Sequence, residues 1–223
     1  MTDSFRLGRD GIYRCDAFQE FVWQSHGFGT REASPTAAVT LRQIHSSRVF
    51  NASGLVDRDQ EGDALVTDQI RSSIGVRTAD CVPILLFDCR RRAVAAVHAG
   101  WRGTASGVVK CTVEKMARDF ESSPADIYAA IGPCIRVCCY EVGSEVAQRF
   151  ASLFPEWGQQ PDATPRKLDL PEANRRQLQA AGLNPERIFD SCLCNVCQAA
   201  QFFSYRRDPA NPGRMLSAIA RLA

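Results

Sequence analysis

The chain has 223 residues, of which 45% are hydrophobic and 23% charged, and its formal net charge is +2. This length and composition suit a hydrophobic core of ordinary size, and we expect one domain over residues 1–223. The small, well-mixed charge gives no electrostatic footprint for nucleic acid or for an anionic membrane, so partners of those classes are not expected.

The N-terminal residues Met1–Arg6 are polar and lack the apolar segment of a signal peptide. The longest purely apolar run, Val82–Phe87, is far too short to cross a bilayer. We therefore expect a cytoplasmic protein.

Several short segments have the apolar composition of strands. In chain order they are residues 38–41, 64–67, 73–77, 82–88, 93–97, 127–131 and 187–190. The segments 82–88 and 93–97 are almost continuously apolar, which is typical of strands buried on both faces. The charged segment Cys89–Arg92 connects these two as a turn.

Helices are expected between the strands. Apolar residues recur at helical spacing over 104–120 and over 141–154. A third helix starts near Asp169, with Pro171 in its first turn and Gly182 as its end. The interleaving of strands and helices predicts an α/β or α+β fold in which helices cover a largely buried sheet.

The chain has only three histidines, His26, His45 and His98. His98 ends the apolar segment 93–97 and precedes a glycine-containing turn, Ala99–Gly103. Ligands often bind where a strand ends and such a turn opens, and free N–H groups at a following helix start attract anions. The alternative is a structural core histidine that bonds a backbone carbonyl.

Cys81 immediately precedes the strand 82–88, whereas His98 follows the strand 93–97. If the two strands pair antiparallel, the thiol and the imidazole lie at the same edge of the sheet. Such a pair supports a thiolate nucleophile with a histidine base, or two ligands of a metal. The alternative is a cysteine that acts as a small buried hydrophobic residue.

His45 follows the strand expected at 38–41. As a third convergent group it would complete a His₂Cys set with an open fourth position, which is the pattern of a catalytic zinc site. Water in that position becomes acidic near neutral pH. Spacing alone does not show that His45, Cys81 and His98 meet.

Ten cysteines are many, but in a chain of this size without a signal peptide free thiols or metal ligands are favoured over disulfides. Cys194 and Cys197 form a C-x-x-C pair beside Cys192, a spacing found in structural zinc sites. The fourth ligand of such a site has no clear source nearby in the sequence. More distant suppliers are Cys134, Cys138 and Cys139. We expect buried or incidental thiols here rather than a second metal site.

The segment Phe202–Asp208 places an aromatic pair beside Arg206 and Arg207. It can stack a base and hold an anion, or it can form a final strand with solvated arginines. The chain contains no GxSxG elbow, Walker A loop, HExxH motif or dinucleotide-binding fingerprint, which excludes several classes of enzyme.

The sequence resembles the YfiH-like family, also called the laccase-domain (polyphenol oxidase) or peptidoglycan editing factor family and described as purine nucleoside phosphorylases. The resemblance rests on motifs that follow one another from about residue 27 to about residue 219. They are Gln43-x-His45, Gly62-Asp-Ala64 with Val66-Thr67, Thr78-Ala-Asp-Cys81-x-Pro83, His98–Gly103, Ile131-Gly-Pro133, Cys139–Gly143, Phe202–Asp208 and Gly213-Arg214.

The resemblance implies a single layered domain with mixed β-sheets between helices, of the α-β-β-α type. It implies a metal site on His45, Cys81 and His98, for zinc or copper. It further implies phosphorolysis of adenosine, inosine and methylthioadenosine, together with deamination of adenosine. In such an enzyme we expect Arg31, Arg206 or the helix start after Gly103 to hold phosphate, and Asp80 to carry a proton.

The segment between Arg31 and Gln43 is shorter than is usual in the family, which bears on the pocket wall or the substrate range. Three other functions stay open. They are an amidase that edits peptidoglycan precursors with Cys81 as nucleophile and His98 as base, a copper-dependent phenol oxidase, and a non-catalytic metal-binding protein. Either a monomer or a weak dimer is compatible with the sequence.

Overall fold

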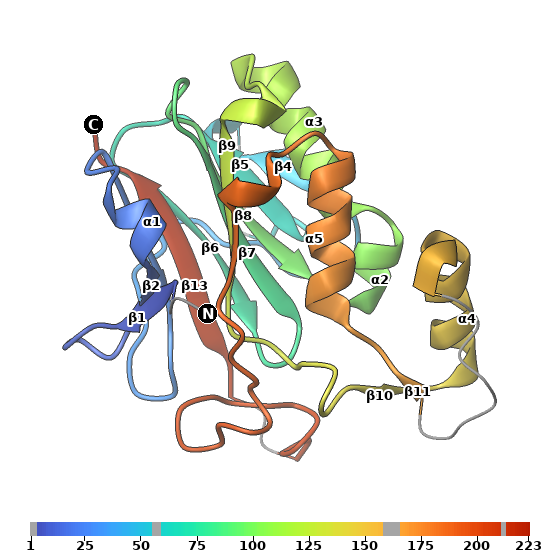
Figure 1. Cartoon of the computed structure of the whole chain (residues 1–223). Helices are drawn as coiled ribbons and strands as arrows, with labels where there is room; N and C mark the ends of the chain where they lie inside the picture. Colours follow the sequence, from blue (N-terminus) through green and yellow to red (C-terminus); the bar gives the residue numbers. More distant parts are fainter. Residues whose placement is uncertain (1–3, 55–58, 158–165, 211–212) are drawn as a thin grey trace.

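Two β-sheets lie against each other at the centre of the structure (Figure 1). The structure is a computed structural model, and it describes residues 4–54, 59–157, 166–210 and 213–223. The larger sheet has the strand order β12-β9-β7-β8-β5-β4, and the smaller has the order β1-β2-β3-β13-β6. In the larger sheet, β12 runs parallel to β9 and β4 parallel to β5, whereas its other pairs are antiparallel. The predicted mixed α+β class is therefore confirmed.

The strands of the larger sheet are β4 (Val49–Asn51), β5 (Ala64–Thr67), β7 (Val82–Asp88), β8 (Val94–Ala99), β9 (Ile127–Ile131) and β12 (Ile188–Asp190). Those of the smaller sheet are β1 (Phe5–Leu7), β2 (Tyr13–Cys15), β3 (Gln24–Phe28), β6 (Ser72–Thr78) and β13 (Met215–Arg221). A separate pair consists of β10 (Glu141–Val142) and β11 (Arg166–Lys167).

The α-helices are α1 (Asp16–Gln19), α2 (Trp101–Ala105), α3 (Val108–Phe120), α4 (Ser144–Leu153) and α5 (Leu170–Ala180). Short 3₁₀ turns cover Ala52–Gly54, Pro124–Asp126, Pro155–Trp157 and Pro185–Arg187. Figure 1 shows α3 and α5 on one side of the sheets and the short α1 on the other. Along the described parts of the chain, no helix has the length and apolar character needed to cross a membrane.

The core has two parts because the strands of the larger sheet are buried on both faces. Along β7, Ile84 and Leu86 belong to the cluster under α3 and α5, whereas Leu85 and Phe87 belong to the cluster between the two sheets. Alternate residues of a strand point to opposite faces, which explains this division. The continuous apolar run at 82–88 reflects that two-sided burial.

Most strands predicted within the larger sheet are confirmed. β5, β7 and β9 have the predicted bounds, and β8 and β12 differ by one or two residues. β7 and β8 pair antiparallel with Pro83 opposite His98, so Cys81 and His98 lie at the same sheet edge, as the sequence indicated. β6 in the smaller sheet confirms the strand predicted at 73–77.

The prediction of a strand at 38–41 is wrong. This segment contacts β6 through an isolated bridge between Val39 and Ile74 and does not form a regular strand. The helix predicted over 104–120 is two helices. The first begins at Trp101, after Gly100 and not after Gly103, and Gly107, whose φ is +76°, separates it from α3. The helix predicted from residue 141 begins at Ser144, since Glu141 and Val142 form β10.

The helix near Asp169 is confirmed as α5, with the Asp169 carboxylate accepting the N–H of Glu172 and Gly182 following at φ +97°. The segment 202–208 forms turns and not a final strand. The last strand is β13, which pairs with both β3 and β6 and was not expected from the sequence.

Candidate metal centre and its cavity

Three side chains from different parts of the chain meet at one end of the larger sheet. His45 lies in the loop before β4, Cys81 directly precedes β7, and His98 lies near the end of β8. One ligand atom from each lies within 4.8 Å of those of the other two. The predicted constellation of His45, Cys81 and His98 is therefore present.

Asp63 positions both histidines from beneath the site. Its carboxylate is fully buried and lies 2.8 Å from Nδ1 of His98. It also accepts the backbone N–H groups of His45 (2.9 Å) and Ser46 (2.6 Å) and the Ser46 hydroxyl (2.7 Å). The bond to His45 holds that residue at φ +61°, a conformation that non-glycine residues adopt infrequently. Because Nδ1 of His98 is occupied, Nε2 is the nitrogen left for a ligand.

The charge distribution favours a thiolate at Cys81. Burial alone would raise the pKa of the Cys81 thiol, but hydrogen bonds with His45 and His98 outweigh burial and lower it to about 6. Burial would lower the pKa of His98, but its bonds to Asp63 and Cys81 raise it to about 9. For Asp63, the bonds from His98 and Ser46 outweigh burial and lower the pKa to about 2. Thiolate is the form that binds metals and attacks electrophiles.

Gly100 leaves the space in which these side chains meet. A Cβ at this position would lie 2.8 Å from Cδ2 of His45 and 3.0 Å from Sγ of Cys81. Both distances are shorter than side chains tolerate without moving, so a residue with a side chain here would displace the ligands. The glycine of the turn after β8 is therefore required by the site.

These residues fit a transition-metal ion. Two imidazoles and one thiolate form a donor set used by catalytic zinc sites, and it also suits copper. The carboxylate on the second nitrogen of His98 is the usual outer partner of a metal-bound histidine. The three ligands face a cavity, which leaves room for a further group.

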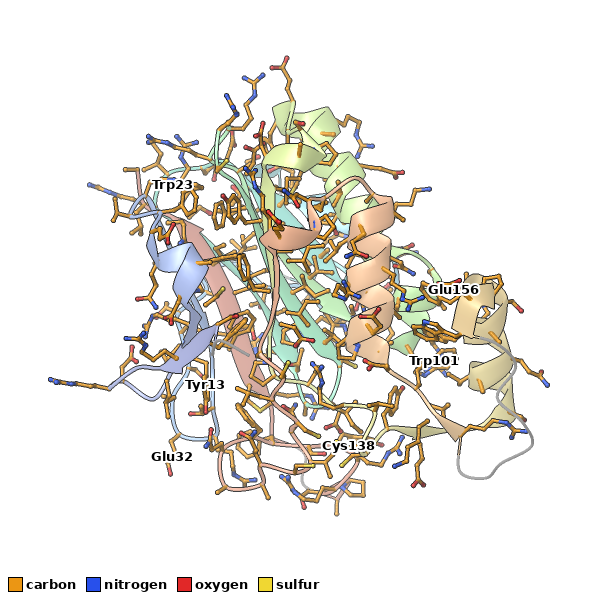
Figure 2. The ribbon with its side chains drawn as sticks, viewed as in Figure 1. Tyr13, Trp23, Glu32, Trp101, Cys138 and Glu156 are labelled. Atoms are coloured by element: carbon orange, nitrogen blue, oxygen red, sulfur yellow. The ribbon has the colours of Figure 1, made fainter. Side chains whose placement is uncertain are left out.

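The cavity has a volume of about 540 Å³, within the range that binds small molecules. Its lining includes the three ligands, four arginines and three large aromatic side chains. The arginines are Arg77, Arg102, Arg206 and Arg214, and the aromatics are Trp101, Tyr140 and Tyr205. Figure 2 shows Trp101 at the start of α2, on the side of the molecule that faces α4.

Asp80 is the one carboxylate that lines this cavity among the described residues. One of its oxygens accepts the backbone N–H of Arg206 at 2.7 Å, and the other is buried without a hydrogen-bond partner in the described parts of the chain. Burial raises the pKa of this carboxyl group above its ordinary value. Asp80 has φ +88°, so its backbone is in an unfavourable region beside the site.

The arginines singled out from the sequence have different positions. Arg206 lies in the cavity wall, where its guanidinium donates to the carbonyl of Glu141 at 3.0 Å and lies over the ring of Tyr140. Arg31 does not line the cavity. Its guanidinium lies over the ring of Phe203, 4.5 Å from the centroid, and donates weakly to the carbonyls of Ala199 and Phe202.

Sequence reasoning assigned no role to Asp63, Arg102 and Tyr140. Each lies within a short motif of the family resemblance, but nothing in the motifs separated these side chains from their neighbours. The signal that was available for Asp63 is its position as an acidic residue directly before the buried strand β5. For Arg102 it is the position directly after Trp101 in the turn that follows His98.

The comparison with known proteins agrees with this geometry. A family model described as "Multi-copper polyphenol oxidoreductase laccase" matches residues 25–222. A purine nucleoside phosphorylase of Clostridium acetobutylicum is 39% identical over 81% of this chain and 75% of its own length. An adenosine deaminase named RL5, from an unknown prokaryotic organism, is 41% identical over 82% of this chain and 74% of its own.

A solved structure has the same fold over nearly the whole chain. The crystal structure of YlmD from Geobacillus stearothermophilus superposes with a TM-score of 0.86 at 30% identity and covers 99% of this chain and 100% of that one. The match extends over both sheets and over the segments that carry His45, Cys81 and His98. This chain therefore belongs to the laccase-like family of YfiH and YlmD, which the matching family model describes as multi-copper polyphenol oxidoreductases.

Proposed function

We propose that this protein is a purine nucleoside phosphorylase that cleaves adenosine, inosine and methylthioadenosine, and that it also deaminates adenosine. The observation that carries the proposal is the combination of groups around one cavity. Arginines, aromatic rings and a His-Cys-His set line the same space of about 540 Å³. The names of the relatives from Clostridium acetobutylicum and of RL5 support the two reactions.

The charge of the cavity suits phosphate. Four arginines line it, against the single carboxylate of Asp80 in the described lining. Guanidinium groups hold phosphate through paired hydrogen bonds, and they remain charged at every working pH. Arg206 is one of the residues proposed to bind it, because its side chain lines the cavity and its backbone N–H is fixed on Asp80 at 2.7 Å.

The aromatic side chains suit a purine. Tyr140, Tyr205 and Trp101 offer flat faces within the same cavity. Stacking on such faces is worth about 1–3 kcal/mol per base and depends little on which base it is. This tolerance fits an enzyme that accepts adenosine, inosine and methylthioadenosine alike.

In phosphorolysis, an oxygen of phosphate forms a bond to C1′ of the ribose while the bond from C1′ to the purine nitrogen breaks. The departing purine takes a proton, and the second product is the sugar 1-phosphate, which is ribose 1-phosphate from adenosine and inosine and 5-methylthioribose 1-phosphate from methylthioadenosine. Arg206 and Arg102 hold the attacking phosphate, and Asp80, whose pKa is raised by burial, donates the proton to the leaving base.

In deamination, water adds to C6 of the adenine ring and ammonia leaves. Asp80 moves the proton from the attacking water to the leaving amine, a role that suits a carboxyl group with a raised pKa. When bound to His45, Cys81 and His98, a divalent ion supplies a Lewis acid to the cavity. Zinc fits the donor set, and copper is the second candidate.

The test is an assay of purified protein with each nucleoside, with and without phosphate. Free base, ribose 1-phosphate and ammonia are measured separately. We expect phosphate-dependent release of base and phosphate-independent release of ammonia from adenosine, both lost in Cys81→Ala. Turnover of no nucleoside in the metal-loaded protein contradicts the proposal, and oxygen uptake with a phenol supports the oxidase instead.

A further inference from the structure

Four cysteines outside the cavity gather at one point, although they come from segments more than fifty residues apart. Cys138 and Cys139 lie in the turn that precedes β10, and Cys194 and Cys197 lie in the turn that follows β12. Their four sulfur atoms all lie within 4.8 Å of one another. Figure 2 shows Cys138 among the loops at the end of the molecule where these two segments meet.

The backbone holds the two turns together. β9 and β12 are parallel neighbours with Ile131 beside Asp190, and the chains that leave them continue side by side. The N–H of Cys134 donates to the carbonyl of Leu193 at 3.2 Å, and the N–H of Asn195 donates to the carbonyl of Cys134 at 3.0 Å. Nη1 of Arg136 donates to both carboxylate oxygens of Asp190, at 2.6 and 2.9 Å. The cysteines are therefore placed by the sheet and not by chance contacts of loose loops.

The spacing of the sulfur atoms suits a single metal ion bound by all four. Sγ of Cys197 lies 3.7 Å from Sγ of Cys138 and 3.4 Å from Sγ of Cys139. A zinc ion with Zn–S bonds of about 2.3 Å separates its four sulfurs by about 3.8 Å. A disulfide needs about 2.05 Å between sulfurs and joins only two of them. The two distances from Cys197 are close to that value, and the remaining sulfur pairs lie within 4.8 Å.

Backbone groups line one side of the cluster. The Cys194 sulfur lies against the backbone N–H groups of Arg136, Val196 and Cys197. The N–H of Gln198 donates to the carbonyl of Cys194 at 3.0 Å and closes the turn. Four thiolates and one Zn²⁺ carry a net charge of −2, and a cation lies close by, because Nζ of Lys167 donates to the carbonyl of Cys138 at 2.9 Å.

We propose that Cys138, Cys139, Cys194 and Cys197 bind one structural Zn²⁺ ion, separate from the ion of the cavity. All four ligands come from the protein, so the site offers no open position for a substrate. Soft thiolates select zinc over magnesium, calcium or manganese. Cys134 and Cys192 do not belong to the group. The expectation of incidental thiols in this region is replaced by a defined set of four.

This ion would join two segments that line the cavity. On one side of the cluster, Ile135 and Tyr140 belong to the cavity wall, and on the other side, Tyr205 and Arg206 follow a few residues after Cys197. The N–H of Ile135 also donates to the carbonyl of Asp80 at 2.9 Å. A zinc ion between the two turns therefore fixes the wall that carries the proposed base-stacking and phosphate-binding groups.

The test uses the Cys81→Ala variant, in which the cavity site lacks its thiolate, so that the result is independent of the proposed function. The protein is purified under reducing conditions, dialysed and analysed for zinc. We expect one zinc per chain, and X-ray absorption at the zinc edge is expected to show four sulfur neighbours at about 2.3 Å. Adding Cys197→Ser is expected to remove this zinc, whereas adding Cys192→Ser, the matched control outside the cluster, retains it.

A second measurement covers the case in which Cys197→Ser fails to fold. The folded Cys81→Ala protein is titrated with a mercurial thiol reagent while released zinc is followed with a chromogenic chelator. Zinc release in step with modification of four thiols per ion supports the site. Absence of zinc, a disulfide detected by mass spectrometry between any of the four cysteines, or a zinc shell with nitrogen or oxygen neighbours overturns it.

Discussion

Nδ1 of His98 lies 2.8 Å from a carboxylate oxygen of Asp63, and the same carboxylate holds the backbone of His45. One buried acid thus orients two of the three ligands. Loss of such an outer partner typically weakens metal affinity by about 10–100-fold. For Asp63→Asn we predict a loss in this range, measured by competition with a chromogenic chelator.

The matched control for this prediction is Asp88→Asn, another fully buried acid that lies at the far end of β7 and away from the ligands. An affinity that is unchanged in Asp63→Asn, or reduced equally in Asp88→Asn, would contradict the positioning role of Asp63.

Gly100 offers a test of the space between the ligands. In Gly100→Ala, the new Cβ would meet His45 and Cys81 at 2.8 and 3.0 Å, so the ligands must move. Misplacement of reacting groups by about 1 Å costs up to about 100-fold in rate. We predict a loss of activity of this size and a lower metal content, measured by steady-state kinetics and elemental analysis.

Gly143→Ala is the control, because a Cβ there meets nothing within 4 Å. If both alanine variants retain the activity of the unchanged protein, the close approach at Gly100 is not needed by the site.

Variants of Arg206 and Arg31 distinguish two alternative positions for the phosphate site. Arg206 lines the cavity, whereas Arg31 lies over Phe203 outside its lining. A hydrogen bond to a charged group contributes about 1.5–3 kcal/mol, which corresponds to about 10–100-fold in binding. We predict that Arg206→Ala raises the KM for phosphate by this factor and that Arg31→Ala leaves it unchanged. The reverse pattern would move phosphate binding to Arg31.

His26 gives a prediction about stability and pH that is independent of the metal. It is 6% exposed, its Nε2 accepts the N–H of Cys15 at 2.9 Å, and burial followed by the nearby charge of Arg14 lowers its pKa to about 4. At pH values below 6.5, the ordinary pKa of histidine, His26 is protonated in the unfolded chain but stays neutral in the folded chain. Stability contributed by this group is therefore complete above pH 6.5 and is lost as the pH falls from 6.5 to about 4.

A shift of this size corresponds to about 3 kcal/mol in the free energy of unfolding across that window. Urea unfolding at several pH values measures it, with His26→Gln as the comparison because an amide oxygen can still accept the Cys15 N–H. We predict that the variant loses less stability than the unchanged protein between pH 6.5 and pH 4. If both proteins lose the same unfolding free energy between pH 6.5 and pH 4, protonation of His26 is not the cause of the loss.

The sequence predicted the buried strands of the larger sheet well, because β7, β8 and β9 are apolar on both faces and leave a continuous signal. It also indicated that Cys81 and His98 share one sheet edge if their strands pair antiparallel, and the structure shows that pairing. β13 was missed although it is an interior strand of the smaller sheet, between β3 and β6. Its sequence lies at the end of the chain, and its partners β3 and β6 are far away in sequence, so no local pattern marks the pairing.

The site was predicted less completely than the sheet. His45 carries a clear chemical group, but its place depends on a bond to Asp63 eighteen positions later, which no periodicity shows. The four-cysteine cluster depends on the parallel pairing of β12 with β9, a long-range contact. Only the C-x-x-C half of that set is visible as a local motif. The sequence therefore identified residues that can bind a metal, but only the fold shows which of them lie close together.

The proposed phosphorolysis is tested most directly by the products formed from adenosine in the presence of phosphate. The decisive measurement is the amount of ribose 1-phosphate formed from adenosine by the metal-loaded protein and by its Cys81→Ala variant. We predict that the protein forms ribose 1-phosphate in step with the free base and that the variant forms none. Absence of ribose 1-phosphate, or its equal formation by both proteins, would contradict the proposed phosphorolysis at the His45, Cys81 and His98 site.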